Sequence, residues 1–103
     1  MERFSNLVPS LVRSLPDDPE IVEKVVISLW RPAVGEAIAE ASRAQSFTDG
    51  RLTVGVRDKN WKAQLDSIVP ELVAKMNRFL GKSIVRYIEI EAAPDLFAVS
   101  QKD

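Results

Sequence analysis

The sequence predicts a small α+β domain in which helices pack on one face of a small sheet of two or three strands. Residues 51–57 alternate between apolar and polar side chains, which is typical of a half-buried strand. Apolar residues between positions 61 and 79 recur at spacings of three and four, which predicts an amphipathic helix. The length of 103 residues suits one domain.

The composition argues against several classes of enzyme. The chain contains neither histidine nor cysteine, which counts against Ser-His-Asp catalysis, zinc sites and disulfides but leaves carboxylate or magnesium mechanisms open. The pair Asp17-Asp18 is explained by helix capping, and Glu89 and Glu91 share a strand face without a second set of ligands. We therefore expect that the protein is not an enzyme and that it has no catalytic residue, metal site or cofactor.

The chain shows no sign of membrane insertion or secretion. No apolar run approaches the roughly 20 residues that span a bilayer. Residues 1–6 do not combine a basic start with an apolar stretch, so they do not resemble a signal peptide. We expect a cytoplasmic protein without a membrane partner.

Two helical segments are expected before the first strand. The first carries apolar residues at helical spacing, namely Phe4, Leu7, Val8, Leu11, Val12 and Leu15. It either closes the core or docks onto a partner, and it begins or bends at Pro9. The second begins near Pro19, capped by Asp17 or Asp18, and runs into the low forties. Pro32 should kink or split it, and we interpret Gly35 as a site of close packing.

The predicted strand at 51–57 follows a turn at Asp49-Gly50. The alternation directs Leu52, Val54 and Val56 to the core and Arg51, Thr53, Gly55 and Arg57 to the opposite face. Gly55 would allow another segment to approach that face closely.

A helical region follows, with Asp58 or Asn60 as its cap and Gly81 just beyond its end. Pro70 interrupts it, which leaves one bent helix and two short helices equally open. Residues 83–91 form the last predicted strand. Arg86 shares a face with apolar residues there, so it lies at a sheet edge or the strand carries a bulge.

Two strands alone rarely form a stable sheet. A third strand must come from residues 44–49, from residues 95–100 or from a partner chain, so a homodimer is possible. We expect the domain to cover residues 1–91 and residues 92–103 to form a flexible tail in which Phe97 is a possible anchor.

The charge distribution points to a nucleic-acid contact. Lys and Arg outnumber Asp and Glu by eight to three over residues 51–86, although the net charge of the whole chain is −1. The candidate contact residues are Arg51, Thr53, Arg57, Lys59, Lys62 and Arg86. They predict salt-sensitive, sequence-independent DNA binding, and a solvated polar rim is an equally good interpretation.

Two tryptophans are candidates for base stacking, and one tyrosine is a candidate for the contact surface. Trp30 and Trp61 are the two tryptophans, and both lie on apolar helix stripes, so we favour a core role over a stacking role. Tyr87 would join the contact surface if it lies on the outer face of the sheet, or it covers a neighbouring loop.

The ordered set of motifs from Trp30 to Ile90 resembles the DciA family. The set comprises the W-x-x-x-V-G element at 30–35, the L-x-V-x-V strand at 52–56, and the helix with Trp61, Leu65, Leu72, Met76-Asn77 and Gly81. The matching core positions are Trp30, Val34, Gly35, Leu52, Val54, Val56, Trp61 and Leu65. No single motif is specific for the family, but the order of the motifs along the chain is.

This resemblance implies a KH-like fold, with a replicative helicase and single-stranded DNA as partners. The implied role is to assist loading or activation of that helicase at replication initiation. Many members are basic and carry a disordered C-terminal extension, whereas this chain is near neutral, so we expect weak DNA binding. The chain also lacks the GxxG loop of nucleic-acid-binding KH domains. The alternative is a protein-interaction domain, such as a homodimer or scaffold, without DNA binding.

Overall fold

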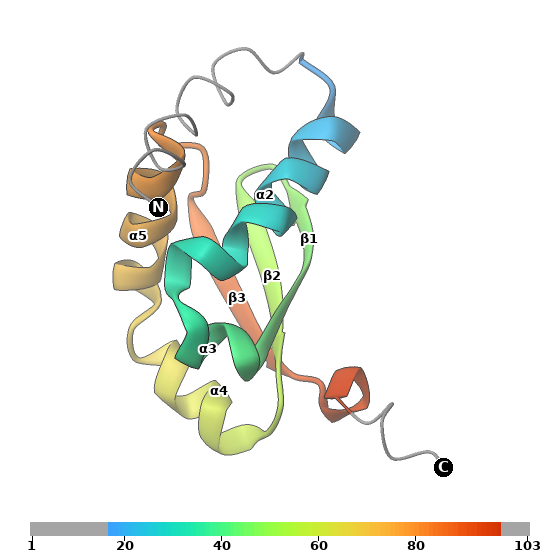
Figure 1. The fold of residues 1–103 in the computed structure, drawn as a ribbon, viewed down its shortest axis with the longest axis vertical. Helices are drawn as coiled ribbons and strands as arrows, with labels where there is room; N and C mark the ends of the chain where they lie inside the picture. The colour runs from blue at the N-terminus through green and yellow to red at the C-terminus, as the bar shows by residue number, and fades with distance from the viewer. Residues whose placement is uncertain (1–16, 98–103) are drawn as a thin grey trace.

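The computed structural model describes residues 17–97 as a layer of helices on a three-stranded sheet. Figure 1 shows the order of the elements. These are α2 (Pro19–Val34), α3 (Glu36–Glu40), β1 (Ser42–Thr48), β2 (Arg51–Val56), α4 (Lys59–Asp66), α5 (Val69–Leu80), β3 (Tyr87–Ala92) and the 3-10 helix η1 (Pro94–Phe97). The helix predicted around residues 4–15 lies outside the described residues.

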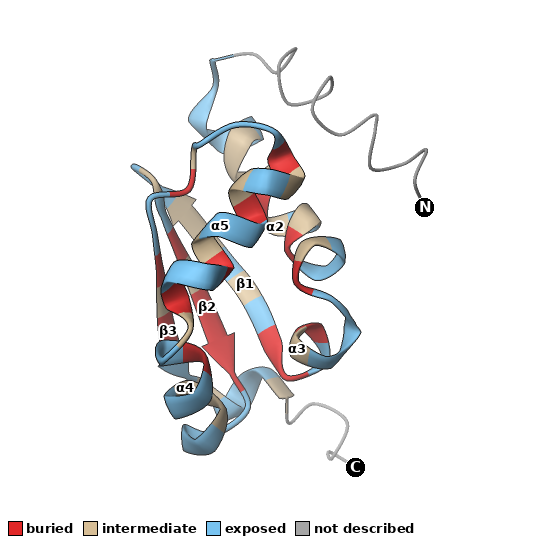
Figure 2. Ribbon diagram, turned by 90° about the vertical axis from the view of Figure 1, so that its left-hand side faces the viewer, coloured by how far each residue is buried: buried red, intermediate tan, exposed pale blue. Residues whose placement is uncertain are grey.

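The sheet has the order β1-β2-β3, with β1 antiparallel and β3 parallel to the central strand β2. The parallel pair requires a crossover, which α4 and α5 supply. The main helices lie on one face of the sheet, and the core fills the space between the two layers (Figure 2). Leu52, Val54, Val56 and Ile88 are fully buried there. The predicted α+β architecture, with helices on one face of a small sheet, is confirmed.

The third strand comes from the chain itself. Of the alternatives left open by the sequence, the segment at 44–49 is the one that pairs, as β1 from Ser42 to Thr48. A bulge between Ala44 and Ser46 interrupts its register with β2. The backbone N–H of Phe47 donates a 3.1 Å hydrogen bond to the Glu23 carboxylate of α2. A partner chain is therefore not needed to complete this sheet.

The long second helix is divided at Gly35, not at Pro32. Pro32 is exposed inside α2, and Ser28, whose carbonyl loses its usual helical donor, is exposed as well. Gly35 instead adopts φ 94° and ψ 165°, a combination that is essentially restricted to glycine. A Cβ built on Gly35 would meet nothing within 4 Å, so our close-packing interpretation of this residue is wrong. Its role is to let the chain turn between α2 and α3.

The predicted tail is ordered as far as Phe97. β3 continues to Ala92, and η1 packs against β2 on the face opposite the main helices. A Cβ added at Gly55 would lie 2.7 Å from Leu96 Cδ1, which confirms that the glycine permits a close approach. The Arg43 guanidinium lies 4.4 Å from the centre of the Phe97 ring and fixes the end of η1 by a cation–π contact.

One buried hydrogen bond joins the helical layer to the sheet. Trp30, which is 3% exposed, donates from its indole Nε1 to Ser42 Oγ at 2.9 Å. The Ser42 hydroxyl in turn donates to the Ile38 carbonyl at 2.6 Å. Every described buried side-chain polar atom has a partner, so the tryptophan is a satisfied core residue.

We expect Ser42→Ala to lower the free energy of unfolding by about 1–3 kcal/mol, because the indole N–H would stay buried without an acceptor. Urea denaturation followed by tryptophan fluorescence measures this change. Ser28→Ala is the matched control: its hydroxyl is exposed and donates only within α2, so the change should stay within about 0.5 kcal/mol. Equal losses in the two variants would contradict the role of the Trp30–Ser42 bond.

Gly35→Ala should also destabilise the fold, by about 1–3 kcal/mol, although the new methyl group would touch nothing. The cost arises from the backbone conformation alone. Thermal unfolding of this variant beside Ala37→Gly, an exposed position in α3, separates backbone strain at residue 35 from general loss of helix propensity. An unchanged melting temperature for Gly35→Ala would refute the conformational explanation.

Candidate functional site

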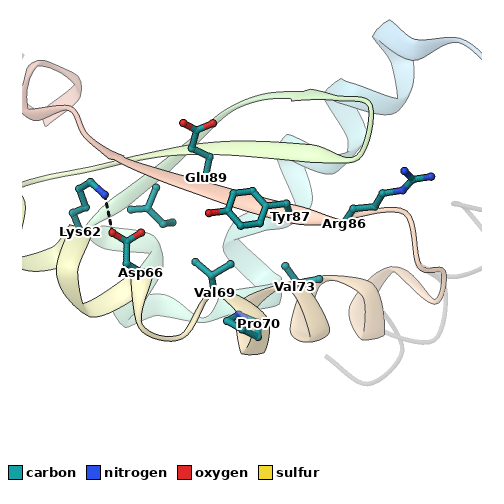
Figure 3. A pocket seen from close by; sticks show the side chains of 9 residues that line it. Lys62, Asp66, Val69, Pro70, Val73, Arg86, Tyr87 and Glu89 are labelled. Atoms are coloured by element: carbon teal, nitrogen blue, oxygen red, sulfur yellow. Dashed lines mark hydrogen bonds and ion pairs between the residues drawn. The ribbon is translucent and has the colours of Figure 1, made fainter.

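A groove of about 780 Å³ runs along the outer edge of β3. Its volume lies within the roughly 300–1,000 Å³ of typical ligand pockets. Figure 3 shows β3 on one side of the groove and the start of α5 on the other. The lining residues are Lys62, Asp66, Val69, Pro70, Val73, Arg86, Tyr87, Glu89 and Ile90. The groove thus combines an apolar wall from α5 with polar side chains from α4 and β3.

The side chain of Asn77 determines where β3 begins. Its Oδ1 accepts hydrogen bonds from the backbone N–H groups of Ile84 and Val85 at 3.1 and 2.9 Å, and its Nδ2 donates to the Val85 carbonyl at 2.8 Å. Residues 83–86 are held outside the sheet by these bonds, and the strand starts at Tyr87. The predicted strand start at residue 83 is therefore too early.

This late start also resolves the position of Arg86. Arg86 precedes the strand, so it needs neither the edge position nor the bulge that we considered. Its N–H donates to the Gly50 carbonyl at 2.7 Å, and the stem of its side chain lies over Gly50. The exposed guanidinium is left at one end of the groove, as Figure 3 shows.

Four of the six predicted contact residues gather around Tyr87 and Glu89. Arg51 lies beside Tyr87 in the β2–β3 register, and Thr53 lies beside Glu89. Tyr87 is 51% exposed. Lys62 and Arg86 line the groove together with Tyr87 and Glu89. The four are Arg51, Thr53, Lys62 and Arg86.

Two of these cations are neutralised by nearby carboxylates. Arg51 forms a 3.0 Å ion pair with Glu89, and Lys62 forms a 2.7 Å ion pair with Asp66. The hydrogen bond that the Lys62 ammonium donates to the Asp66 carboxylate raises the pKa of Lys62, so the ammonium stays protonated at neutral pH. Both pairs are exposed and contribute little to stability.

Arg57 and Lys59 lie at the opposite end of the sheet, where β2 leads into α4. Six residues of extended chain separate Arg57 from Arg51, a span of about 20 Å. Among residues 17–97, no carboxylate forms an ion pair with Arg57, Lys59 or Arg86. The sequence-predicted residues therefore form two groups rather than one continuous basic surface.

The motif residues are mainly structural. Seven of the eight matched core positions face the interior, six buried and one half-buried: Trp30, Val34, Leu52, Val54, Val56 and Leu65, with Trp61 half-buried. Gly35 is exposed and acts through its backbone. Both tryptophans thus belong to the core, as we favoured, and Tyr87 is the exposed aromatic residue near the cations.

Sequence analysis missed the apolar wall of the groove. Val69, Pro70 and Val73 lie in the same helical region as the predicted apolar stripe but are not part of it, and Pro70 was interpreted only as an interruption of the helix. Their signal was weak, because side chains that line a groove and side chains that fill a core share the same helical spacing. Arg43 was also missed, since its role depends on Phe97, which lies far away in the sequence.

Two further properties of residues 17–97 concern membranes and metal ions. No helix in this part of the chain is both long and apolar enough to cross a bilayer. No group of three or more Asp or Glu side chains there is arranged to hold a metal ion.

The amino-acid sequence of this chain matches a known protein family over most of its length. Residues 3–90 match the family described as "Dna[CI] antecedent, DciA". The chain belongs to the DciA family. The first resemblance drawn from Trp30 and the strand at 52–56 is thereby confirmed.

Several curated relatives carry the name UPF0232 protein. The Mycobacterium tuberculosis relative is 34% identical over 76 residues, which cover 72% of this chain and 41% of the relative. The Rhodococcus jostii relative is 26% identical over 84% of this chain and 46% of its own length. The Bifidobacterium longum relative is 39% identical over 59% of this chain and 39% of its own. The chain thus spans less than half the length of these relatives.

Asn77→Ala should lower the free energy of unfolding by about 1–3 kcal/mol, because two N–H groups and one carbonyl lose their partner at the start of β3. Amide NMR spectra should show changes concentrated at residues 83–90. Asn60→Ala, at an exposed position in α4, should leave both stability and these signals unchanged. A stable Asn77→Ala protein with native signals for Ile84 and Val85 would show that the carboxamide does not position the strand.

Proposed function

We propose that this DciA-family chain is a non-enzymatic binding module that assists loading or activation of a replicative helicase on single-stranded DNA. The family match over residues 3–90 carries this proposal. The described structure supports a binding role, because the groove beside β3 and the exposed cations are open surfaces on a folded domain. The helicase contact rests on family membership alone.

We further propose that DNA is held mainly by the cations without ion-paired carboxylates. Arg57 and Lys59 flank Asp58, whose carboxylate caps the start of α4 by accepting the N–H of Trp61 at 2.9 Å, so the two side-chain cations, not the helix N–H groups, would attract a phosphate. Arg86 stands beside the exposed ring of Tyr87, on which an unpaired base can stack. Arg51 and Lys62 are secondary contacts, since each must exchange a carboxylate for a phosphate. This arrangement supports weak binding with strong salt dependence.

The charge-reversal variant Arg57→Glu/Lys59→Glu tests the DNA contact. We expect at least a tenfold loss of affinity for a fluorescent oligothymidine and a decrease of roughly 1.4 in the slope of log K against log salt concentration. Fluorescence anisotropy at 50 and 150 mM salt measures both.

The matched control is Lys24→Glu/Lys75→Glu, which changes the net charge equally at exposed positions on α2 and α5. Equal losses of DNA affinity in both variants would show that the effect arises from the overall charge and not from Arg57 and Lys59. Absence of DNA binding by the native protein, together with retention on an immobilised helicase, would favour the alternative of a pure protein-interaction domain. Co-elution with the replicative helicase of the same organism tests the other half of the proposal.

A further inference from the structure

A second, smaller groove of about 180 Å³ lies where the start of α2 meets the turn between β1 and β2 (Figure 1). This hairpin groove is mainly apolar, with Pro19 and Val22 of α2 and Phe47 of β1 in its lining. Val22 and Phe47 are only half-buried, so part of the apolar surface faces solvent. The volume lies below the roughly 300–1,000 Å³ of typical ligand pockets, which suits a single long side chain better than a small molecule.

Three carboxylates also line the hairpin groove, those of Glu20, Glu23 and Asp49. Glu20 and Asp49 are exposed. Glu23 accepts the N–H of Phe47 at 3.1 Å through Oε2 alone, so its other oxygen can accept a further donor. In the described part of the chain, no Lys or Arg forms an ion pair with any of the three.

The nearest cations in the sequence leave this negative charge uncompensated. Arg51 is paired with Glu89 at 3.0 Å, and Lys24 does not line the hairpin groove. Asp17 and Asp18, which are exposed, add further negative charge just before α2. Apolar surface beside free carboxylates is complementary to a side chain that has an apolar stem and a cationic head.

From this complementarity we infer that the hairpin groove binds an arginine side chain of a protein partner. The stem of the arginine packs on Pro19 and Val22, and its guanidinium lies beside Phe47 and donates to the carboxylates. Arginine fits better than lysine, because the planar guanidinium carries five donors, stacks on aromatic rings and is more weakly hydrated. The inference goes beyond the proposed function, because it names a surface and an anchor that hold whether or not DNA is bound.

A nucleic acid and a metal ion both fit the hairpin groove less well. Carboxylates repel phosphates, which need an excess of cations. Within residues 17–97, no three Asp or Glu side chains are arranged to hold a metal ion. An arginine of a partner gains from the apolar contact and from the charge together, and arginine is enriched among the anchor residues of protein interfaces.

Two short peptides test the inference on the native chain: acetyl-Gly-Arg-Gly-amide and its counterpart with citrulline, which has nearly the shape of arginine but no charge. In amide NMR titrations, the arginine peptide should shift the signals of Val22, Phe47 and Asp49. We expect it to bind about fivefold more tightly than the citrulline peptide, because several exposed ion pairs, each of them weak, act together.

Glu20→Gln/Asp49→Asn removes two of the charges at nearly constant shape and should abolish the preference for arginine over citrulline. Asparagine tolerates the φ of 52° at residue 49, so the turn should be preserved. Glu71→Gln/Asp95→Asn is the matched control, since it makes the same two replacements at exposed positions of α5 and η1 and should keep the native preference. Thr48→Lys places a competing cation in the lining and should weaken binding of the arginine peptide while tryptophan fluorescence reports a native core.

Three results would overturn the inference. The first is the absence of shifts at Phe47 and Asp49 with the arginine peptide at millimolar concentration. The second is equal binding of the arginine and citrulline peptides by the native chain. The third is a change of these signals without any peptide, either on dilution or in Arg3→Ala/Arg13→Ala, which would identify a second copy or the chain's own N-terminal segment as the occupant.

The outcome is separable from that of the proposed function. Glu20→Gln/Asp49→Asn should bind oligothymidine at least as tightly as the native chain, because it removes negative charge and none of the cations. The Arg57→Glu/Lys59→Glu variant should keep its preference for the arginine peptide, because neither residue lines the hairpin groove.

Discussion

The three hydrogen bonds of the Asn77 carboxamide fix the register of β3, and the groove beside this strand depends on that register. They stop residues 84 and 85 from joining the sheet and deliver the chain to Tyr87 in register with Arg51. A shift of one residue would exchange Ile88 and Ile90 for Tyr87 and Glu89 in the core. The same bonds therefore keep the isoleucines buried and the carboxylates and the tyrosine on the surface.

The buried layer and the exposed groove are linked through the crossover. Since β3 runs parallel to β2, the chain must pass over the sheet through α4 and α5 before it returns. The junction between these helices brings Val69 and Pro70 beside the last strand. At this junction the chain has Asp66-Ser67-Ile68-Val69, and nowhere does it carry the GxxG sequence of nucleic-acid-binding KH domains. The groove is thus walled by apolar side chains.

Much of the fold follows from the periodicity of the sequence. The alternation at Leu52, Val54 and Val56 identified the central strand, and Asp58 and Gly81 marked the limits of the helical crossover. The division at Gly35 was missed because φ and ψ are not encoded by periodicity, and Pro32 gave a stronger breaker signal nearby. β1 was left as one of several alternatives, since its bulge disrupts the alternation that marks a strand.

The candidate site was less predictable for a physical reason. The sequence gives the number of cationic side chains, but the electrostatic field at a surface depends on which carboxylates lie beside them. Lys62 and Asp66 are four residues apart on a helix, a spacing that permits an ion pair, whereas no sequence pattern joins Arg51 to Glu89, 38 residues away. Arg57 and Lys59 were correctly placed on the outside, yet their separation from Arg51 follows only from the length of β2. The predicted contact residues therefore lie in two separate groups, and their binding to DNA remains a proposal.

One edge of the sheet has a consequence for assembly. β1 offers no regular edge to another strand, because it carries a bulge and because Glu23 accepts the N–H of Phe47. Edge-to-edge stacking of sheets into open-ended fibres needs two regular edges on every molecule, so the described fold resists it.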